Sequence, residues 1–375
     1  MSLQRVKDGV LTAEAGLVGR DLELLSPITI EIEDGRVRRI EEGREPGADD
    51  DFDVVLPAPF NAHVHAADWA FRHAGLGMPL EKVVAPPDGL KHRLLEKVGE
   101  RELEVSIRDF LETSLSFGCP GVADFREGGV EGLKLGLRAA EGFPTYVPMG
   151  RPKALDDPER VEEELRVLSE LTEFVGIPDV HLPDDVLEAV RDSGLRVYVH
   201  ANENWRSVRE CVREHGATEI ERAVDLLEPE GIVHCVVLTD RDRELLEELD
   251  PVVILCPRSN DYYRLGNPDP RRLRGLRVLL GTDNGMSVEP DPWAEAYHAW
   301  IRTGLSPLGA LRALTVEAAS VFDLPILEEG RRLSAVGLKG LPLPETVLGS
   351  RQRLAAHVLQ LIKTSRVHVL LGAES

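Results

Sequence analysis

Long hydrophobic runs are absent from this chain. No stretch of 18 or more apolar residues occurs in it, and the N-terminal segment MSLQRVKDGV has no apolar centre. A membrane-spanning helix needs about 20 apolar residues, and a signal peptide needs an apolar central region. We therefore expect a cytoplasmic protein that has no membrane partner.

Cysteine and positive charge are both scarce. The four cysteines are widely spaced and form no C-x-x-C pair, which argues against a cysteine zinc site and against a disulfide framework. Lysine and arginine number 44 against 66 acidic residues, and the formal net charge is -22. A surface of this sign repels a nucleic-acid backbone. We expect a small molecule, and not a nucleic acid, as the partner of this protein.

Internal repeats are missing as well, whereas short apolar runs recur through the middle of the chain. Eight of them alternate with amphipathic helical stretches, which is typical of βα units and a parallel sheet. No glycine-rich dinucleotide motif follows the first run, and this disfavours a doubly wound open sheet. We predict an α/β fold with a (β/α)8 TIM-type barrel over residues 54–323. The eight runs are DVVLPAPF, GVADF, TYVPMG, EFVGI, LRVYVH, GIVHC, VVILCP and VLLGTD.

The two ends of the chain carry strand signals of another kind. The segment ITIEIEDGRVRRI alternates isoleucine with polar residues, turns at Asp34-Gly35 and then continues with valine and isoleucine. This pattern indicates a hairpin. Near the C-terminus, SRVHVLLG reads as another short strand. We expect residues 1–53 and 324–375 to form one small β-sandwich domain together.

Two histidines, His63 and His65, stand one residue apart at the end of the first predicted barrel strand. In an extended strand they point to the same face, so both imidazoles enter one small volume. Other predicted strands also end in polar residues, and barrel closure brings the carboxyl ends of all strands to one mouth. Besides the first pair, the strand-end residues are His200, His234 and Asp283.

This set of side chains suits a metal-dependent hydrolase. Three imidazoles and one carboxylate form a fitting shell for a divalent metal, with zinc as the first candidate and ferrous iron as the alternative. A bound cation lowers the pKa of water toward neutrality. Glu203, three residues after His200, is placed to move a proton from that water to a leaving nitrogen. His234 is placed to polarise the water or stabilise an oxyanion, and Asp283 to share the proton.

Taken singly, each of these residues also has a structural explanation. Asp283 could cap a helix or fix a turn, and Glu203 could lie on a solvated first helical turn. A single strand-end histidine such as His200 or His234 is often a satisfied core residue. The joint pattern favours function, because all five residues fall at predicted strand ends.

Five motifs of the chain resemble those of a known family. They are NAHVH, HANE, VHCVVLTD, CPRSN and LGTDNGM. Their order resembles the amidohydrolase superfamily, in its cytosine deaminase-like and chlorohydrolase-like branch related to S-adenosylhomocysteine deaminase. The resemblance covers the barrel and, more weakly, the terminal β domain. It implies a hydrolase acting on carbon–nitrogen bonds other than peptide bonds, and a homodimer, since barrels of this type often dimerise.

The resemblance also implies roles for particular residues. It makes Glu203 the proton shuttle and places His234 beside the hydrolytic water. Binuclear members take a lysine from the fourth strand, whereas this strand end reads EFVGIPDVH; only a shifted register would supply Lys153 instead. We therefore expect one metal ion. The implied ligands are His63, His65, His200 and Asp283.

The residues after HVH depart from the family pattern. Related deaminases continue with a leucine-arginine-glycine segment, whereas this chain has a long insertion from Ala66 to Arg101. Long loops on this face of a barrel commonly shape the substrate pocket. A salt bridge or a loop hydrogen bond explains each candidate substrate contact equally well. By position alone, the candidates are Trp69, Arg72, Arg126 with Glu127, Arg151, His181, Arg258 and Asn284.

Three functions stay open at the level of sequence. The first is hydrolytic deamination of an amino-substituted heterocycle such as a purine or pyrimidine. The second is hydrolysis of a cyclic amide on the same scaffold. The third is a non-catalytic barrel that binds a metal or a metabolite. Glu203 and His234 disfavour the third function, because a binding protein needs no proton shuttle.

Overall fold

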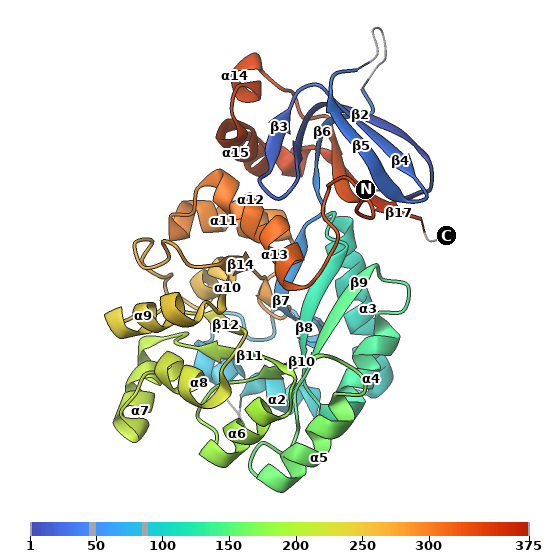
Figure 1. Ribbon diagram of the computed structural model, residues 1–375. Helices are drawn as coiled ribbons and strands as arrows, with labels where there is room; N and C mark the ends of the chain where they lie inside the picture. Colours follow the sequence, from blue (N-terminus) through green and yellow to red (C-terminus); the bar gives the residue numbers. More distant parts are fainter. Residues whose placement is uncertain (1, 45–49, 85–88, 374–375) are drawn as a thin grey trace.

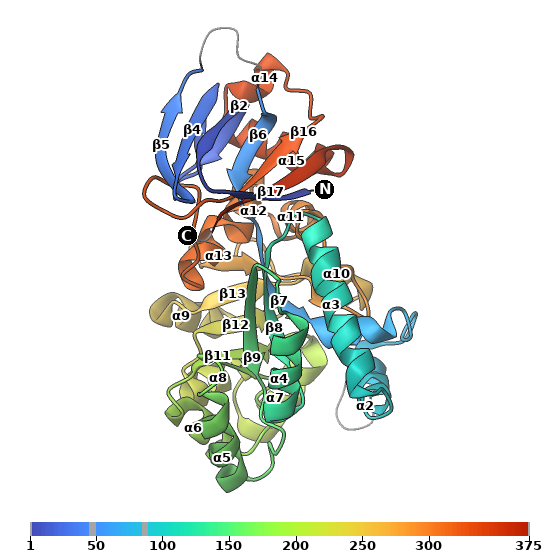
Figure 2. The same ribbon diagram turned by 90° about the vertical axis from the view of Figure 1, so that its right-hand side faces the viewer.

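The computed structural model describes residues 2–44, 50–84 and 89–373. Its strands form two separate sheets, and Figures 1 and 2 show the smaller sheet above the larger one. The smaller sheet combines both ends of the chain, and the larger sheet is built from its middle. None of the helices in the described part of the chain is long and apolar enough to cross a membrane.

The smaller sheet is mixed and joins strands that are far apart in the sequence. β1 pairs in parallel with β17, so a β domain built from both termini is present, as predicted. The predicted hairpin is formed by β4 and β5, and its turn residues Asp34 and Gly35 have φ values of 49° and 70°. Two positive φ angles are what a type I′ hairpin turn requires. In order, the strands are β1 (Ser2–Val6), β17 (Arg366–Gly372), β16 (Ser334–Lys339), β6 (Phe52–Pro57), β2 (Gly9–Val18), β4 (Ile28–Glu33) and β5 (Arg36–Glu42), with β3 (Glu23–Leu25) beside β2.

The larger sheet closes into a barrel. All its neighbouring strands are parallel. β14 and β15 stand at opposite ends of its pairing order, yet only Gly281 and Thr282 separate them in the chain. The predicted (β/α)8 fold is therefore confirmed. The strands are β7 (Phe60–His65), β8 (Gly121–Arg126), β9 (Thr145–Gly150), β10 (Phe174–Ile177), β11 (Arg196–Ala201), β12 (Gly231–His234), β13 (Val252–Leu255), β14 (Val278–Leu280) and β15 (Asp283–Asn284).

The first barrel strand differs from the prediction. Most of the run DVVLPAPF lies in β6, which pairs with β2 and β16 in the smaller sheet. The barrel begins one strand later, at β7. A fully apolar run fits a buried strand of either sheet, so its pattern could not decide between them. The boundary predicted between residues 53 and 54 falls within β6.

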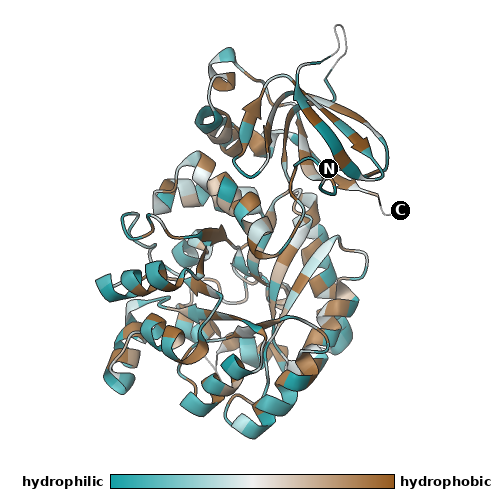
Figure 3. Cartoon of the chain, in the orientation of Figure 1, coloured by the Kyte–Doolittle hydropathy of each residue, from teal (hydrophilic) through white to brown (hydrophobic). Residues whose placement is uncertain are grey.

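Helices surround the barrel with their apolar sides inward, and Figure 3 shows polar residues on their outer faces. The insertion after β7 holds η1, α1 and α2, while its residues 85–88 lie outside the described part. Near the smaller sheet, α15 packs on α12. The helices are η1 (Ala66–Phe71), α1 (Leu80–Val84), α2 (Leu90–Leu95), α3 (Glu100–Ser116), α4 (Gly129–Ala139), α5 (Pro158–Leu168), α6 (Asp184–Asp192), α7 (Trp205–His215), α8 (Glu219–Leu227), α9 (Asp240–Leu249), α10 (Pro257–Tyr262), α11 (Pro292–Thr303), α12 (Pro307–Leu314), α13 (Val316–Val321), α14 (Glu345–Leu348), α15 (Arg351–Leu361) and η2 (Ile362–Thr364).

Candidate active site

Four predicted metal ligands converge at the carboxyl ends of the barrel strands. His63 and His65 lie at the end of β7, His200 lies near the end of β11, and Asp283 begins β15. Nε2 of His63 lies 3.2 Å from Nε2 of His200 and 3.3 Å from Oδ1 of Asp283. Nε2 of His65 lies 3.4 Å from Nε2 of His200 and 3.6 Å from Oδ1 of Asp283. The structure thus gathers one donor atom from each residue around a single point.

These separations fit one divalent cation. Zinc bonds of about 2.0–2.1 Å in a tetrahedral arrangement place neighbouring donor atoms roughly 3.4 Å apart. In the rings of His65 and His200 the other nitrogen, Nδ1, already lies within hydrogen-bond distance of an oxygen atom. Nδ1 of His200 lies 3.2 Å from the carbonyl oxygen of Ile177, and Nδ1 of His65 lies 3.2 Å from Oε1 of Glu127. Both rings therefore turn an Nε2 lone pair toward the common point, as metal ligands must.

Burial sets the charge states of these groups. It lowers the pKa of His63 to about 4 and, with the neighbouring imidazoles, holds the pKa of His200 well below its usual value. Burial alone would raise the pKa of Asp283, but its hydrogen bond with His63 and the nearby imidazoles hold that pKa well below the usual range. Neutral imidazoles and an ionised carboxylate are the forms that bind a metal.

The backbone is strained where it presents two of the site residues. Asp283 has a φ of 62° and His234 a φ of 77°. This left-handed region is uncommon for residues other than glycine and is concentrated at functional sites. At Gly281, a Cβ atom would lie 2.6 Å from Cβ of His63 and 2.7 Å from its backbone nitrogen. Only glycine lets the chain pass so close to β7 just before Asp283.

Glu203 and His234 lie beside the four donor atoms. Oε1 of Glu203 lies 3.5 Å from Nε2 of His234, and burial raises the pKa of Glu203. On its other side, His234 places Nδ1 3.1 Å from Oδ1 of Asn260. The hydroxyl group of Ser259 donates a hydrogen bond to Oδ2 of Asp283. Because Ser259 and Asn260 both stand on α10, this one short helix supports two sides of the site.

A cavity of about 230 Å³ opens over these residues. Four of the eight predicted substrate contacts lie in its wall together with Glu203 and His234: they are Glu127, Arg151, His181 and Asn284. Nε2 of His181 lies 2.9 Å from Oε1 of the buried Glu219. This hydrogen bond raises the pKa of His181. Part of the wall comes from the insertion, through Leu80, Glu81, Val84, Lys91 and His92.

The other four predicted contacts lie outside the cavity wall, and their side chains interact with other residues of the protein. Trp69 is buried, and its Nε1 donates a hydrogen bond of 2.7 Å to Asp109. The guanidinium group of Arg72 lies 4.2 Å from the centre of the Trp69 ring. Arg126 and Arg258 each form ion pairs with neighbouring carboxylates. The structure does not bring these four side chains to the cavity.

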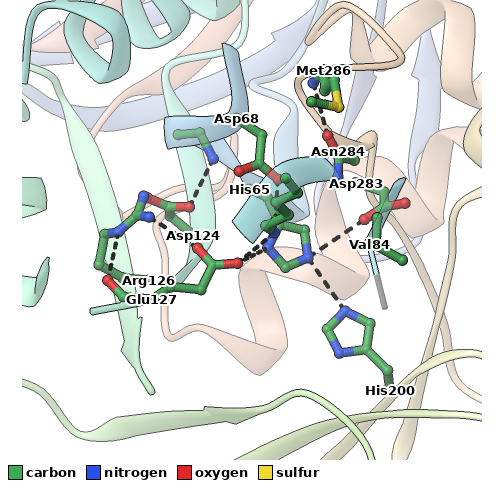
Figure 4. A network of polar contacts seen from close by, with 12 residues as sticks. His65, Asp68, Val84, Asp124, Arg126, Glu127, His200, Asp283, Asn284 and Met286 are labelled. Carbon is green, nitrogen blue, oxygen red and sulfur yellow. Dashed lines mark hydrogen bonds and ion pairs between the residues drawn. The ribbon is translucent and has the colours of Figure 1, made fainter. Parts of the chain in front are cut away.

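A buried ionic network next to His65 has no clear sequence signal, and Figure 4 labels its two carboxylates, Asp68 and Glu127. Nζ of Lys91, on α2, lies 2.5 Å from Oε1 of Glu127 and 2.7 Å from Oδ2 of Asp68. Burial would raise the pKa of Glu127, but Lys91 and the hydrogen bond with His65 hold that pKa well below its usual range. No motif marks Lys91 or Asp68. In contrast, Ser259 lies in the recognised motif CPRSN.

A parallel barrel with three imidazoles, a carboxylate and a half-buried glutamate at the carboxyl ends of its strands defines the class of metal-dependent barrel hydrolases. The model of the amidohydrolase family matches residues 54–354. The chain belongs to the amidohydrolase family, as its motifs predict. The predicted enzyme class, a hydrolase acting on carbon–nitrogen bonds other than peptide bonds, is thereby confirmed.

Relatives and solved structures agree with this membership. An uncharacterized protein of Methanocaldococcus jannaschii is 31% identical over 340 residues, which cover 84% of this chain and 86% of that protein. A 5'-deoxyadenosine deaminase of Methanopyrus kandleri is 27% identical over 325 residues, or 77% of this chain and 73% of the relative. The crystal structure of an adenosine deaminase from Xanthomonas campestris with bound zinc matches 96% of this chain and 89% of its own, with a TM-score of 0.74 and 18% identity. At that identity the likeness shows the fold alone.

Proposed function

We propose that this protein hydrolytically deaminates an amino-substituted heterocycle, such as a purine or pyrimidine, with one divalent metal ion in its site. The observation that carries the proposal is the cluster of four donor atoms beside the half-buried carboxyl group of Glu203. The relative named 5'-deoxyadenosine deaminase supports this substrate class. We also propose that the protein is a homodimer and lies in the cytoplasm.

The metal would be held by the four residues that the structure gathers. When bound, a divalent metal polarises water and lowers its pKa toward neutrality. Zinc is the first candidate and ferrous iron the second, because both accept imidazole and carboxylate ligands. A single ion is favoured because β10 ends without a lysine and Lys153 lies outside the cavity wall. The proposed ligands are His63, His65, His200 and Asp283.

Glu203 is the residue that transfers the proton in the proposed reaction. Burial raises the pKa of its carboxyl group, so it exchanges a proton nearer to neutral pH than an exposed glutamate does. Water adds to the ring carbon that bears the amino group, and Glu203 transfers a proton from that water to the adjacent ring nitrogen. The proton of the added hydroxyl group then passes to the amino group. The carbon–nitrogen bond breaks, and ammonia leaves a ring carbonyl behind.

His234 orients the carboxyl group of Glu203. With Oδ1 of Asn260 as acceptor, Nδ1 of His234 carries the ring proton and Nε2 keeps a lone pair. That lone pair faces Oε1 of Glu203 at 3.5 Å and accepts a hydrogen bond when the carboxyl group is protonated. This contact orients the carboxyl group of Glu203 while it is protonated.

The substitution Glu203→Gln tests the proposal directly. Glutamine keeps the shape of the side chain but cannot carry the proton, so kcat should fall by roughly 100- to 10,000-fold. The metal content, measured by atomic absorption, should stay at the wild-type level because Glu203 supplies no metal ligand. A variant that turns over at the wild-type rate would disprove the role of Glu203.

A panel of substrates distinguishes the proposed reaction from the alternatives. Aminated heterocycles and lactams are incubated with the metal-loaded protein and scored for ammonia release against ring opening. Ammonia release alone supports deamination, whereas ring opening alone supports cyclic amide hydrolysis at the same site. Metal binding without turnover of any compound would favour a non-catalytic binding protein.

A further inference from the structure

One proposed metal ligand is held by a carboxylate. Nδ1 of His65 lies 3.2 Å from Oε1 of Glu127. Figure 4 marks this contact with a dashed line. An ionised carboxylate only accepts hydrogen bonds, so Nδ1 must be the nitrogen that carries the proton. Nε2 then keeps its lone pair, and Nε2 is the atom that faces His200 and Asp283. The contact with Glu127 therefore selects the tautomer of His65 that can bind a metal.

Two cations in turn hold the carboxylate of Glu127 in place. Nζ of Lys91 lies 2.5 Å from Oε1, and a terminal nitrogen of Arg126 lies 2.9 Å from Oε2. Lys91 is only 4% exposed and Arg126 only 3% exposed, so water hardly competes for these contacts. Arg126 is itself anchored by Asp124, whose Oδ2 lies 3.4 Å away. With both oxygens paired, the carboxylate cannot rotate away from His65.

We propose that Glu127 is a positioning residue of the metal centre, which fixes the tautomer and direction of the His65 ring, and that Lys91 from the insertion fixes Glu127. This inference rests on the metal site of the proposed function. Carboxylate partners of this kind raise the basicity of a metal-binding histidine, and their loss typically costs 10- to 100-fold in metal affinity. Among the three proposed imidazole ligands, within the described residues, only His65 has such a partner: His200 donates to a carbonyl, and Nδ1 of His63 has none.

A role in substrate binding fits Glu127 less well, although its side chain reaches the cavity wall. Three donors already point at its two oxygens, from His65, Lys91 and Arg126. A substrate hydroxyl group would have to displace one of these buried contacts. The geometry thus assigns the carboxylate to the protein's own ring and not to a ligand.

The test compares Glu127→Gln with Asp68→Asn as a matched control. Ligand atoms of His65, Asp68 and Glu127 all lie within 4.8 Å of one another, so each substitution replaces a carboxyl group close to His65 by an amide. Only Glu127→Gln removes the anionic acceptor of Nδ1. We expect it to raise the zinc dissociation constant of the metal-free protein 10- to 100-fold, and Asp68→Asn to raise it less than about threefold. The constant is measured by competition with a chromophoric chelator.

A second variant separates positioning from folding. Glu127→Asp keeps the charge but draws the carboxylate back from Nδ1, so it should weaken zinc binding as Glu127→Gln does. Thermal melting of the metal-free variants reports their folding independently of zinc. Equal losses in Glu127→Gln and Asp68→Asn, or unchanged affinity in Glu127→Asp, would overturn the inference. If the wild-type protein itself binds no zinc, the proposed metal site fails, which is a different result.

Discussion

At the scale of single residues, the site depends on side chains that hydrogen-bond to the proposed catalytic residues and metal ligands but contact neither the metal nor the substrate. Asn260 is buried, and its Oδ1 lies 3.1 Å from Nδ1 of His234. Substitution by alanine leaves that ring nitrogen without its partner, at a cost of about 1–3 kcal/mol. We expect Asn260→Ala to lower kcat about tenfold or more, since 1.36 kcal/mol in the barrier is tenfold in rate. Steady-state kinetics with the best substrate of the panel measure this effect.

The neighbouring residue Ser259 provides the control for this prediction. It stands on the same helix, but its hydroxyl group donates to Asp283, a proposed metal ligand. Ser259→Ala should therefore weaken zinc retention during dialysis, whereas Asn260→Ala should retain zinc as the wild-type protein does. If both variants lose zinc equally, α10 acts on the site as a whole and not through separate contacts.

At the scale of elements, α2 is fixed to the barrel by one buried side chain. Lys91 lies between Asp68 and Glu127, and Asp68 is fully buried. Lys91→Met would leave two buried carboxylates without their shared cation, and breaking a buried ion pair from one side costs about 3–5 kcal/mol. We expect this loss in the free energy of unfolding, measured by denaturant titration of the metal-free protein.

The double substitution Lys91→Met with Asp68→Asn is the matched comparison. It removes one positive and one negative charge together, so Asp68 no longer remains as an unpaired buried anion. We expect it to recover more than half of the stability lost in Lys91→Met. A double variant as unstable as the single one would show that packing of the lysine stem, and not charge pairing, holds α2 in place.

The elements also show what the sequence could and could not predict. Strands β8 to β14 were predictable, because each is an apolar run bounded by helical patterns. The assignment of β6 was not, since its apolar residues suit either sheet. Of the site, His63, His65, His200 and Asp283 could be found because each lies at the end of a predicted apolar run, within a recognised motif. The pairing of Lys91 with Glu127 could not be predicted, because it depends on how the insertion folds back over β8.

At the scale of the whole molecule, the proposed metal links parts of the chain that are distant in sequence. Its ligands come from β7, β11 and β15, so a bound ion joins strands across the barrel mouth. An ion that binds only the folded protein adds about 4 kcal/mol of stability at roughly 1,000 times its dissociation constant. With an unfolding entropy of about 2.1 cal/mol/K per residue, this amounts to about 5 °C for a chain of 375 residues.

We therefore expect removal of the metal by a chelator to lower the melting temperature by about 5 °C, and added zinc to restore it, as measured by differential scanning calorimetry. Magnesium is the control ion, because it prefers an octahedral shell of oxygen ligands and the site offers three imidazoles. His200→Ala should reduce the zinc-dependent shift, since it removes the ring that faces both His63 and His65. Equal shifts with zinc and magnesium would contradict a site built from these histidines.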